Sequence, residues 1–381
     1  EVFELVKQHP HLVQVTDESG RTPLHVAVLG RNTSELPELL LARDADINQQ
    51  DHNGNTPLHW AACHPTGYTF GKYLIECNAK VDIPNKDENF ALHMAVFSNN
   101  FRLVEHLLKN CNPVSVGLKK ANNDENTPLH IVCAVARNPA KLDKMISLMT
   151  EKRAETNALN SRKETPLHIA AAAGCTRIHP SLCDQLTAKD AFGNTPLLSA
   201  ARSLNLAAVQ NLLDMGSSLD IANFDNENIL HLLGFNDIST LTDDDSLHCI
   251  SLLKKLERKN QQRELIRQLL NRSTISTNET PLFYAVSANR LNLVKFFLRR
   301  GNAASANAQN ITGNTPIHIA VQRANRGMVD LLIRKSVVIV SSILLLIFYV
   351  GRLRLVNQTK KDTRRFISVV LRPIHRLQIV F

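Results

Sequence analysis

The hexapeptide GNTPLH at residues 54–59 constrains the fold of this chain more than any other feature, because variants of it return along most of the sequence. Four close copies read GRTPLH, ENTPLH, KETPLH and GNTPIH. Counted at the place of the Thr, the recurrences start at Thr22, Thr56, Phe90, Thr127, Thr165, Thr195, Asn228, Thr280 and Thr315. The intervals are 34, 34, 37, 38, 30, 33, 52 and 35 residues. Such a period predicts a stack of similar units, in which each unit buries its apolar face against its neighbours.

Each residue of the repeated phrase has a role at the start of a helix. The Thr can accept a hydrogen bond from a free backbone N–H of the first turn, and Pro is tolerated at the first helical position because its missing donor would be unpaired there. The Leu is expected in the core, and small pairs such as Ala61-Ala62 allow two helices to approach closely. Phe90 and Asn228 replace Thr and are not followed by Pro, so we expect weaker helix starts there, each costing about 1 kcal/mol.

A turn is predicted before each of these helices, and a second helix after it. Asp or Asn stands five residues before the start in eight of nine cases, and Gly or Asn stands two residues before it in six. These residues satisfy backbone groups locally and tolerate positive φ. Apolar residues spaced i, i+3, i+4, such as Val209, Leu212 and Leu213, then indicate a second helix, which Gly216 is placed to end.

The repeated T-P-L-H phrase and its period resemble the ankyrin repeat family over residues 1–335. The resemblance implies an all-α ankyrin-repeat solenoid of about nine helix-turn-helix repeats with β-turn tips, preceded by a half-repeat at residues 1–16. It also implies that the His in fourth place ties neighbouring turns together through hydrogen bonds. These histidines are His25, His59, His93, His130, His168, His231 and His318.

Members of this family bind partner proteins with their turns and first helices, generally without catalysis. The resemblance therefore places candidate protein-binding residues at the variable turn positions four, three and one before each start. In the four turns that follow the pattern best these are Glu18, Ser19, Arg21, His52, Asn53, Asn55, Ala191, Phe192, Asn194, Ile311, Thr312 and Asn314. Phe192 is the most informative of them, because an aromatic side chain at the tip of a turn has little core to fill.

Two intervals depart from the period. The 30-residue interval after Thr165 is short, which predicts a trimmed second helix near residues 179–186. The 52-residue interval after Asn228 is long, and we expect an insertion at about residues 237–262. One interpretation is a surface insertion before a lengthened second helix, and the other is a docking element on one face of the stack.

The pattern stops near residue 335, and a hydrophobic and then basic tail follows at residues 336–381. Its apolar stretch, 337–350, is short for a membrane span. We consider three explanations: a misjoined or truncated gene model, an apolar end segment that is buried or covered by a partner, and a membrane anchor. We expect this tail to lie outside the solenoid, and membrane contact only through residues 337–350.

Charge and motifs argue against most other functions. The net charge of +9 equals that of the tail from Arg334 onward, with ten Lys/Arg and one Asp, so the body is neutral and offers no field for nucleic acid. Phosphate-binding glycine loops, GxSxG, kinase motifs and zinc spacings are lacking. Seven scattered cysteines, never in a CxxC pair, indicate reduced thiols, and Trp60 is expected to pack rather than bind a ligand.

We therefore expect an intracellular, most simply cytoplasmic, scaffold without cofactor, metal or small-molecule substrate. The chain opens in mid-pattern, and both ends cut the repeat. The alternative is consequently a fragment of a larger protein, such as a cation channel of the transient-receptor-potential type or an enzyme with a separate catalytic domain of the tankyrase kind.

Overall fold

The computed structural model describes residues 8–28, 35–64, 66–135, 138–175, 177–235, 243–258, 262–300 and 306–334. These residues form helices joined by turns, and within these ranges the β-structure amounts to one isolated bridge between Ala222 and Asn228. The predicted all-α class is confirmed. The chain divides into two compact units, Glu1–Ser217 and Ser218–Phe381, which are described in turn.

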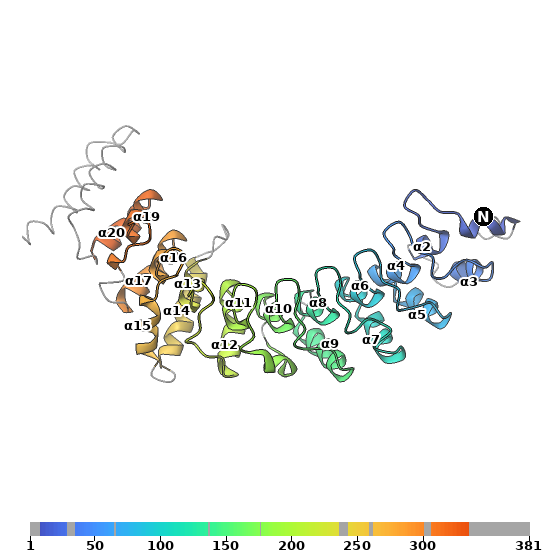
Figure 1. The fold of residues 1–381 in the computed structure, drawn as a ribbon, viewed down its shortest axis with the longest axis horizontal. Helices are drawn as coiled ribbons and strands as arrows, with labels where there is room; N and C mark the ends of the chain where they lie inside the picture. Colours follow the sequence, from blue (N-terminus) through green and yellow to red (C-terminus); the bar gives the residue numbers. More distant parts are fainter. Residues whose placement is uncertain are drawn as a thin grey trace, which may run out of the picture. The chain divides into compact units, whose positions relative to one another are not determined.

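The first unit is a succession of helix pairs (Figure 1). Its elements are η1 (Pro10–Gln14), α2 (Pro23–Ala27), α3 (Glu35–Leu41), α4 (Pro57–Cys63), α5 (Tyr68–Glu76), α6 (Ala91–Phe97), α7 (Phe101–Asn110), α8 (Pro128–Val135), α9 (Pro139–Glu151), α10 (Pro166–Ala172), η2 (Pro180–Gln185), α11 (Pro196–Arg202) and α12 (Leu206–Asp214). The predicted half-repeat at residues 1–16 contributes the 3-10 turn η1, and its residues 1–7 lie outside the described part.

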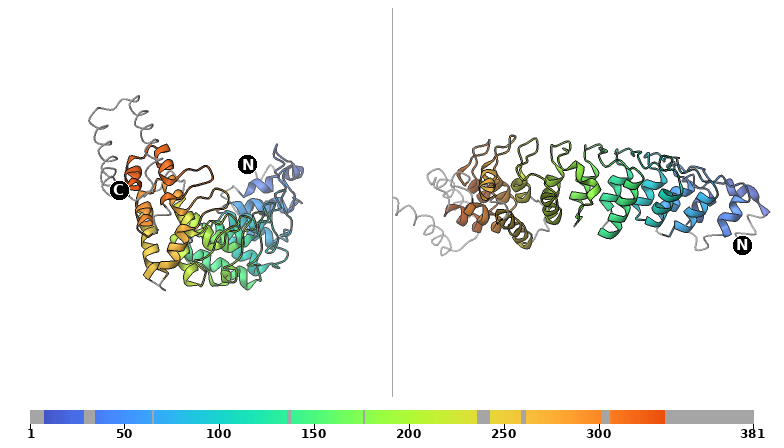
Figure 2. Two further views of the ribbon diagram at one scale, coloured as in Figure 1. Left: turned by 60° about the vertical axis from the view of Figure 1, so that its left-hand side comes forward. Right: turned by 90° about the horizontal axis from the view of Figure 1, so that it is seen from below.

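Helices of the same kind pack on each other from one repeat to the next. The first helices α2, α4, α6, α8, α10 and α11 contact one another in that order, and the second helices α5, α7 and α9 do the same. Figure 1 shows the two rows within this unit, and Figure 2 shows the succession from two other directions. The core lies between the rows, because each repeated Leu, such as Leu58 or Leu167, is at most 1% exposed.

The second unit contains α13 (Ile229–Gly234), α14 (Asp243–Arg258), α15 (Arg263–Asn271), α16 (Pro281–Ser287), α17 (Leu291–Arg300), α19 (Pro316–Gln322) and α20 (Arg326–Ile333). The first helices α13, α16 and α19 pack in sequence, and α17 contacts α14, α15, α16 and α20. With α13, α16 and α19 included, a helix begins directly after each of the nine predicted starts.

The long interval holds two helices rather than one lengthened helix. In α14 the side chains of Cys249 and Leu253 are fully buried, and Glu257 forms a two-point ion pair with Arg300 of α17, at 2.7 and 3.1 Å. The interpretation as a surface insertion is therefore wrong for this helix, which is part of the core of the second unit. An apolar stripe alone does not reveal whether a neighbouring helix covers it.

The other departures have local explanations. The short interval leaves the 3-10 turn η2 in place of a full second helix, as predicted. The sequence predicts a weaker helix start at Asn228, but a cap is present there, because the side-chain oxygen of Asn228 accepts the N–H groups of Leu230 and His231. Phe90 provides no such oxygen. Its ring instead packs against Gly117, where φ is +77° and a Cβ atom would meet the ring at 2.6 Å.

The tail and its apolar stretch, 337–350, lie outside the described residues. Within the part that is described, the helices are all too short or too polar to cross a membrane.

Candidate functional site: the row of turns

The turns before the first helices share one backbone conformation. In eight of them the side-chain oxygen of the Asp or Asn five residues before the start accepts two backbone N–H groups, as Asp51 does from Asn53 and Asn55 at 2.9 and 2.8 Å. The residue two before the start has a φ between 55° and 81° in all nine turns. Glu88, Glu125 and Lys163 also adopt this left-handed conformation, although residues with a Cβ atom rarely do so.

Consecutive turns within a unit are linked through their backbones. The N–H of the residue four before a start donates to the carbonyl oxygen of the residue three before the preceding start. His52 to Ser19 and Ala191 to Arg162 are examples, both at 2.9 Å. This link joins backbone atoms only, and it fixes the spacing of the tips. The side chains at the two positions take no part in it.

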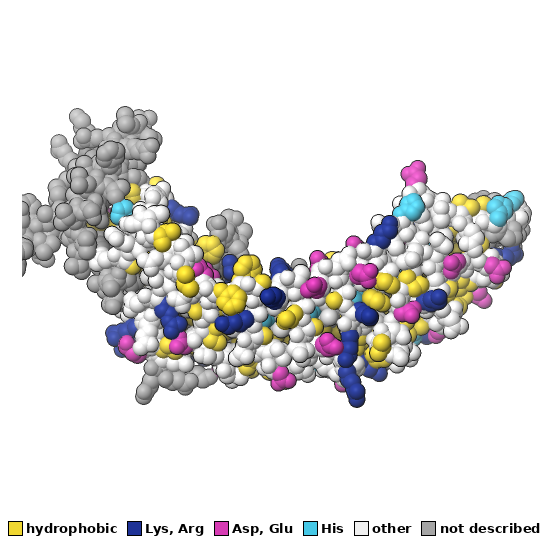
Figure 3. Space-filling view, viewed as in Figure 1, with side chains coloured by type: hydrophobic (Ala, Val, Ile, Leu, Met, Phe, Trp, Pro, Cys, Tyr) yellow, Lys and Arg dark blue, Asp and Glu magenta, His cyan; other side chains and the backbone are white. Residues whose placement is uncertain are grey.

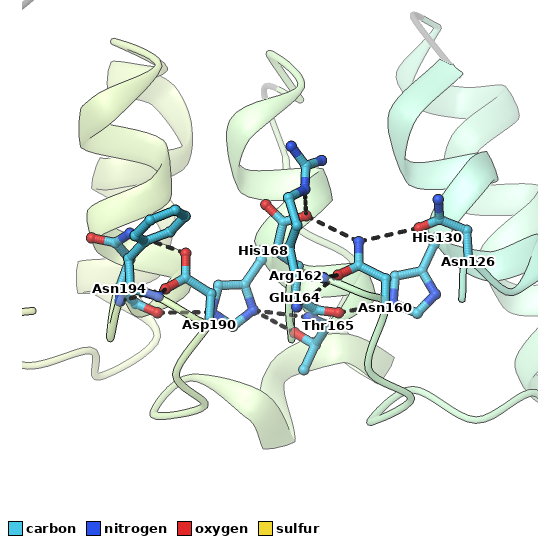
Figure 4. Close-up of polar contacts among 10 residues, drawn as sticks. Asn126, His130, Asn160, Arg162, Glu164, Thr165, His168, Asp190 and Asn194 are labelled. Carbon is cyan, nitrogen blue, oxygen red and sulfur yellow. Dashed lines mark hydrogen bonds and ion pairs between the residues drawn. The ribbon is translucent and has the colours of Figure 1, made fainter. Parts of the chain in front are cut away.

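The repeated His joins each helix start to the next turn (Figure 4). In His168 the Nδ1 atom lies 3.1 Å from the backbone nitrogen of Thr165 and 2.8 Å from its Oγ1, and Nε2 lies 3.0 Å from the carbonyl oxygen of Asn194. A carbonyl oxygen only accepts, so Nε2 carries the hydrogen and Nδ1 accepts from Thr165. His25, His59 and His130 make the same set of bonds.

Two starts lack this His, and their Thr side chains show the consequence. Leu198 and Phe283 stand in its place. The Oγ1 atoms of Thr195 and Thr280 are buried without a hydrogen-bond partner. The Thr and the His therefore act as a pair: where the imidazole is replaced by another side chain, the Thr hydroxyl has no hydrogen-bond partner.

Burial keeps these imidazoles neutral. It lowers the pKa of His93 and of His231 to about 4, and it lowers the pKa of the other five repeat histidines as well. Both ring nitrogens are hydrogen-bonded in His25, His59, His93, His130, His168 and His231, so these groups are not free for acid–base chemistry. Across the described ranges, His, Cys, Asp and Glu do not gather into a group that could hold a metal ion.

The candidate residues one before the start are held by the fold. Asn194 is 3% exposed and donates to Asp190. Asn55 accepts from Asn85 of the following turn, and Asn314 donates to Thr312. Arg21 pairs with Asp17 at 2.6 Å. Their side chains support the turns, which reduces what they can offer a partner.

The candidates three and four before the start lie at the exposed tips. Glu18, Ser19, His52, Asn53, Ala191, Phe192, Ile311 and Thr312 are all exposed. Phe192 is 64% exposed and Ile311 is 69% exposed, so both present apolar surface to solvent. Figure 3 shows side chains of both charges interspersed with apolar ones on the face drawn.

Trp60 is partly exposed and belongs to the turn as much as to the core. Its Nε1 donates to Asp51 at 2.9 Å, and the guanidinium of Arg21 lies 5.3 Å from its ring centre. The expectation of packing thus holds in part, since the ring also closes the turn before it.

Sequence reasoning missed two apolar tips, Phe224 and Ile275, which are 62% and 74% exposed. Phe224 stands four residues before Asn228, and its turn could have been read like the others. Ile275 was concealed because its turn has one more residue: the Oγ1 of Thr274 accepts the N–H of Glu279 in place of the usual Asp or Asn. The backbone link of Ile275 to Asp225 shows that it occupies the same tip position.

Stacked helix pairs with one recurring turn define a repeat protein. The side chains that vary from repeat to repeat lie at the tips of these turns. The family of the chain is shown by sequence models: the model described as ankyrin repeats (3 copies) matches residues 1–85, 133–225 and 255–341, and the model of a single ankyrin repeat matches residues 87–117. The chain belongs to the ankyrin repeat family.

Curated relatives match over much of the chain. The mouse B-cell lymphoma 3 protein homolog is 27% identical over 57% of this chain and 45% of its own length. The human transient receptor potential cation channel subfamily A member 1 is 25% identical over 84% of this chain and 34% of its own. The NAD-dependent deacetylase sir2B of Dictyostelium discoideum is 26% identical over 87% and 45%. The chain thus spans less than half the length of each of these relatives.

Proposed function

We propose that this chain is a non-catalytic scaffold that binds partner proteins through the exposed tips of its turns and the neighbouring surface of its first helices. The observation that carries this proposal is the division of labour within each turn. Residues five, two and one before the start, together with the repeated His, hold the backbone, whereas those three and four before it are both exposed in seven of the nine turns and differ from turn to turn. Side chains that folding does not specify are available for recognition.

The proposal covers the partner class and the location. The partners are proteins, because residues 1–333 are electrically neutral and offer no attraction to a phosphate backbone. Cofactor, metal and small-molecule substrate form no part of the proposal. We place the protein inside the cell, most simply in the cytoplasm. All seven cysteines, at Cys63, Cys77, Cys111, Cys133, Cys175, Cys183 and Cys249, are free thiols, which fits this location.

Phe192→Ala provides the test in the first unit. Peptides that bind the full chain are selected from a phage-displayed library of random 16-residue peptides, and their affinities are measured by fluorescence polarisation. For peptides that occupy the tips of the first unit, we expect Phe192→Ala to weaken binding at least threefold. The free energy of unfolding should change by less than about 0.5 kcal/mol, because the side chain is 64% exposed.

The matched control is Val114→Ala, which removes another exposed apolar side chain, 71% exposed and outside the row of turns. Its effect on binding should be negligible. The proposal fails if no selected peptide binds saturably to the wild-type chain, or if all binding maps away from the turns and first helices.

A second candidate is that the repeats are the binding part of a larger protein. The similarity to a named cation channel over 84% of this chain supports it, as does the similarity to a named deacetylase over 87%. Sequencing of full-length transcripts in both directions decides the matter. Several hydrophobic spans or a catalytic domain encoded in the same transcript would favour the larger protein, and a membrane tether through residues 337–350 would be tested by fractionation.

A further inference from the structure

Three consecutive turn tips of the second unit carry large apolar side chains at the same position. Phe224, Ile275 and Ile311 are 62%, 74% and 69% exposed. We call these three residues the apolar turn row. In the first unit the same position holds Glu18, His52, Lys86, Asn123, Ser161 and Ala191, which are polar or small. A run of three exposed apolar residues at one structural position is therefore particular to the second unit.

The backbone holds the members of this row at fixed spacing. The N–H of Ile275 donates to the carbonyl oxygen of Asp225, next to Phe224, at 3.0 Å. The N–H of Ile311 donates to the carbonyl oxygen of Thr277, which lies in the turn of Ile275, also at 3.0 Å. The tips are thus aligned before any partner arrives, which lowers the entropic cost of binding.

Aromatic side chains extend the apolar surface toward the first helices. The hydroxyl of Tyr284 donates to Glu227, in the turn of Phe224, at 2.8 Å. The ring of Phe235 lies 5.5 Å from that of Tyr284, edge to face, and Phe235 is itself 42% exposed. The contacts lead from the turn through Tyr284 to Phe235 at the end of α13.

The turns that carry this row contain carboxylates and no cationic residue. The three turns, residues 222–227, 274–279 and 309–314, contain Asp225, Glu227 and Glu279 but neither Lys, Arg nor His. The hydrogen bonds of these carboxylates come from neutral groups: Ser276, Tyr284, Asn223 and Asn310. Among the described residues these three carboxylates form no ion pair, so no cation neutralises them at contact distance.

We propose that the apolar turn row binds a segment of a partner protein that presents large apolar side chains together with Lys or Arg. The apolar contacts supply affinity, and the three carboxylates select against acidic segments. This inference rests on the proposed scaffold function and specifies its chemistry in the second unit.

The test uses the full chain and the random 16-residue peptides described above. Enriched peptides should combine apolar residues with Lys or Arg. Phe224→Ser, Ile275→Ser and Ile311→Ser together should weaken their binding at least tenfold. The matched control, Val114→Ser with Leu247→Ser, removes exposed apolar side chains outside the row of turns and should alter affinity less than twofold. If the triple variant does not fold, Ile275→Ser alone should still weaken binding about threefold.

Charge gives an independent measurement. Raising NaCl from 50 to 500 mM should weaken binding of these peptides several-fold, because exposed charges are screened. Versions with Glu in place of each Lys or Arg should not bind. Equal binding of the Glu versions would overturn the inference.

The occupant is identified by placing the photo-crosslinker benzoylphenylalanine at position 275. An adduct with an added basic–apolar peptide supports the inference. An adduct with a second copy of the chain, or with another segment of the same chain, overturns it. Saturable binding of selected peptides that Phe192→Ala weakens and the triple variant does not would also overturn it, while leaving the scaffold function intact. Absence of any saturable peptide binding would overturn both.

Discussion

The substitution His168→Leu tests whether the link between helix start and following turn stabilises the fold. His168 is fully buried, so Leu fills most of the space and the change is mainly the loss of hydrogen bonds. Two groups lose their partner, the N–H and the hydroxyl of Thr165, whereas the carbonyl oxygen of Asn194 keeps the N–H of Asp190. Each buried polar group without a partner costs about 1–3 kcal/mol. Since Thr195 tolerates a buried, unpaired hydroxyl, we expect the lower end of that range for each of the two groups, or about 2 kcal/mol in total.

The measurement is urea unfolding of the first unit, followed by the fluorescence of Trp60, the only tryptophan of the chain. Adding Thr165→Val removes the hydroxyl that needs a partner and should restore about 1 kcal/mol. His52→Leu, the same replacement at an exposed tip, is the control and should change the free energy of unfolding by less than about 0.5 kcal/mol. A loss below about 1 kcal/mol for His168→Leu would refute the argument that this network holds neighbouring turns together.

Three further predictions concern pH, the cap at Asn228 and the role of α14. The pKa of His93 and His231 is about 4 in the folded chain against an ordinary 6.5, so the unfolded chain binds protons first. The free energy of unfolding should therefore be constant above about pH 7 and fall toward pH 4, with a loss of about 1 kcal/mol per His at pH 5.5. Equal unfolding midpoints at pH 7.5 and pH 5.5 would contradict this. Asn228→Ala removes the acceptor of two N–H groups and a donor to Leu269, and calorimetry should show a loss of about 2 kcal/mol. Leu253→Ala in α14 should cost about 2–5 kcal/mol, whereas Leu247→Ala in the same helix, where the side chain is 52% exposed, should cost less than about 0.5; equal small losses would place α14 at the surface.

Local sequence predicted the turns only where the residue type carries the signal. Gly or Asn marked six of the nine positions of positive φ. At Glu88, Glu125 and Lys163 the same conformation arises because the turn must close between the preceding tip and the helix start. The cost of a side chain at positive φ, about 1 kcal/mol, is offset by the two N–H groups that the Asn five residues before each start accepts.

The candidate binding site was predicted in outline and altered in detail. Numbering back from each start found the exposed tips Phe192 and Ile311. It did not find Ile275, because one additional residue shifts that turn. It also grouped Asn194 with the tips, although the backbone directs this side chain inward to Asp190.

The sequence by itself determined the repeating unit: where each first helix begins, which residues close the turn before it, and which His spans the gap to the next. These are interactions between residues close in the chain or one period apart, so their spacing records them. Only the tertiary structure decided that α14 is buried against α17, and that Phe224, Ile275 and Ile311 form one exposed row. Burial and alignment depend on which surfaces meet in space. An apolar residue belongs to the core where a neighbouring helix covers it, and to a potential binding surface where none does.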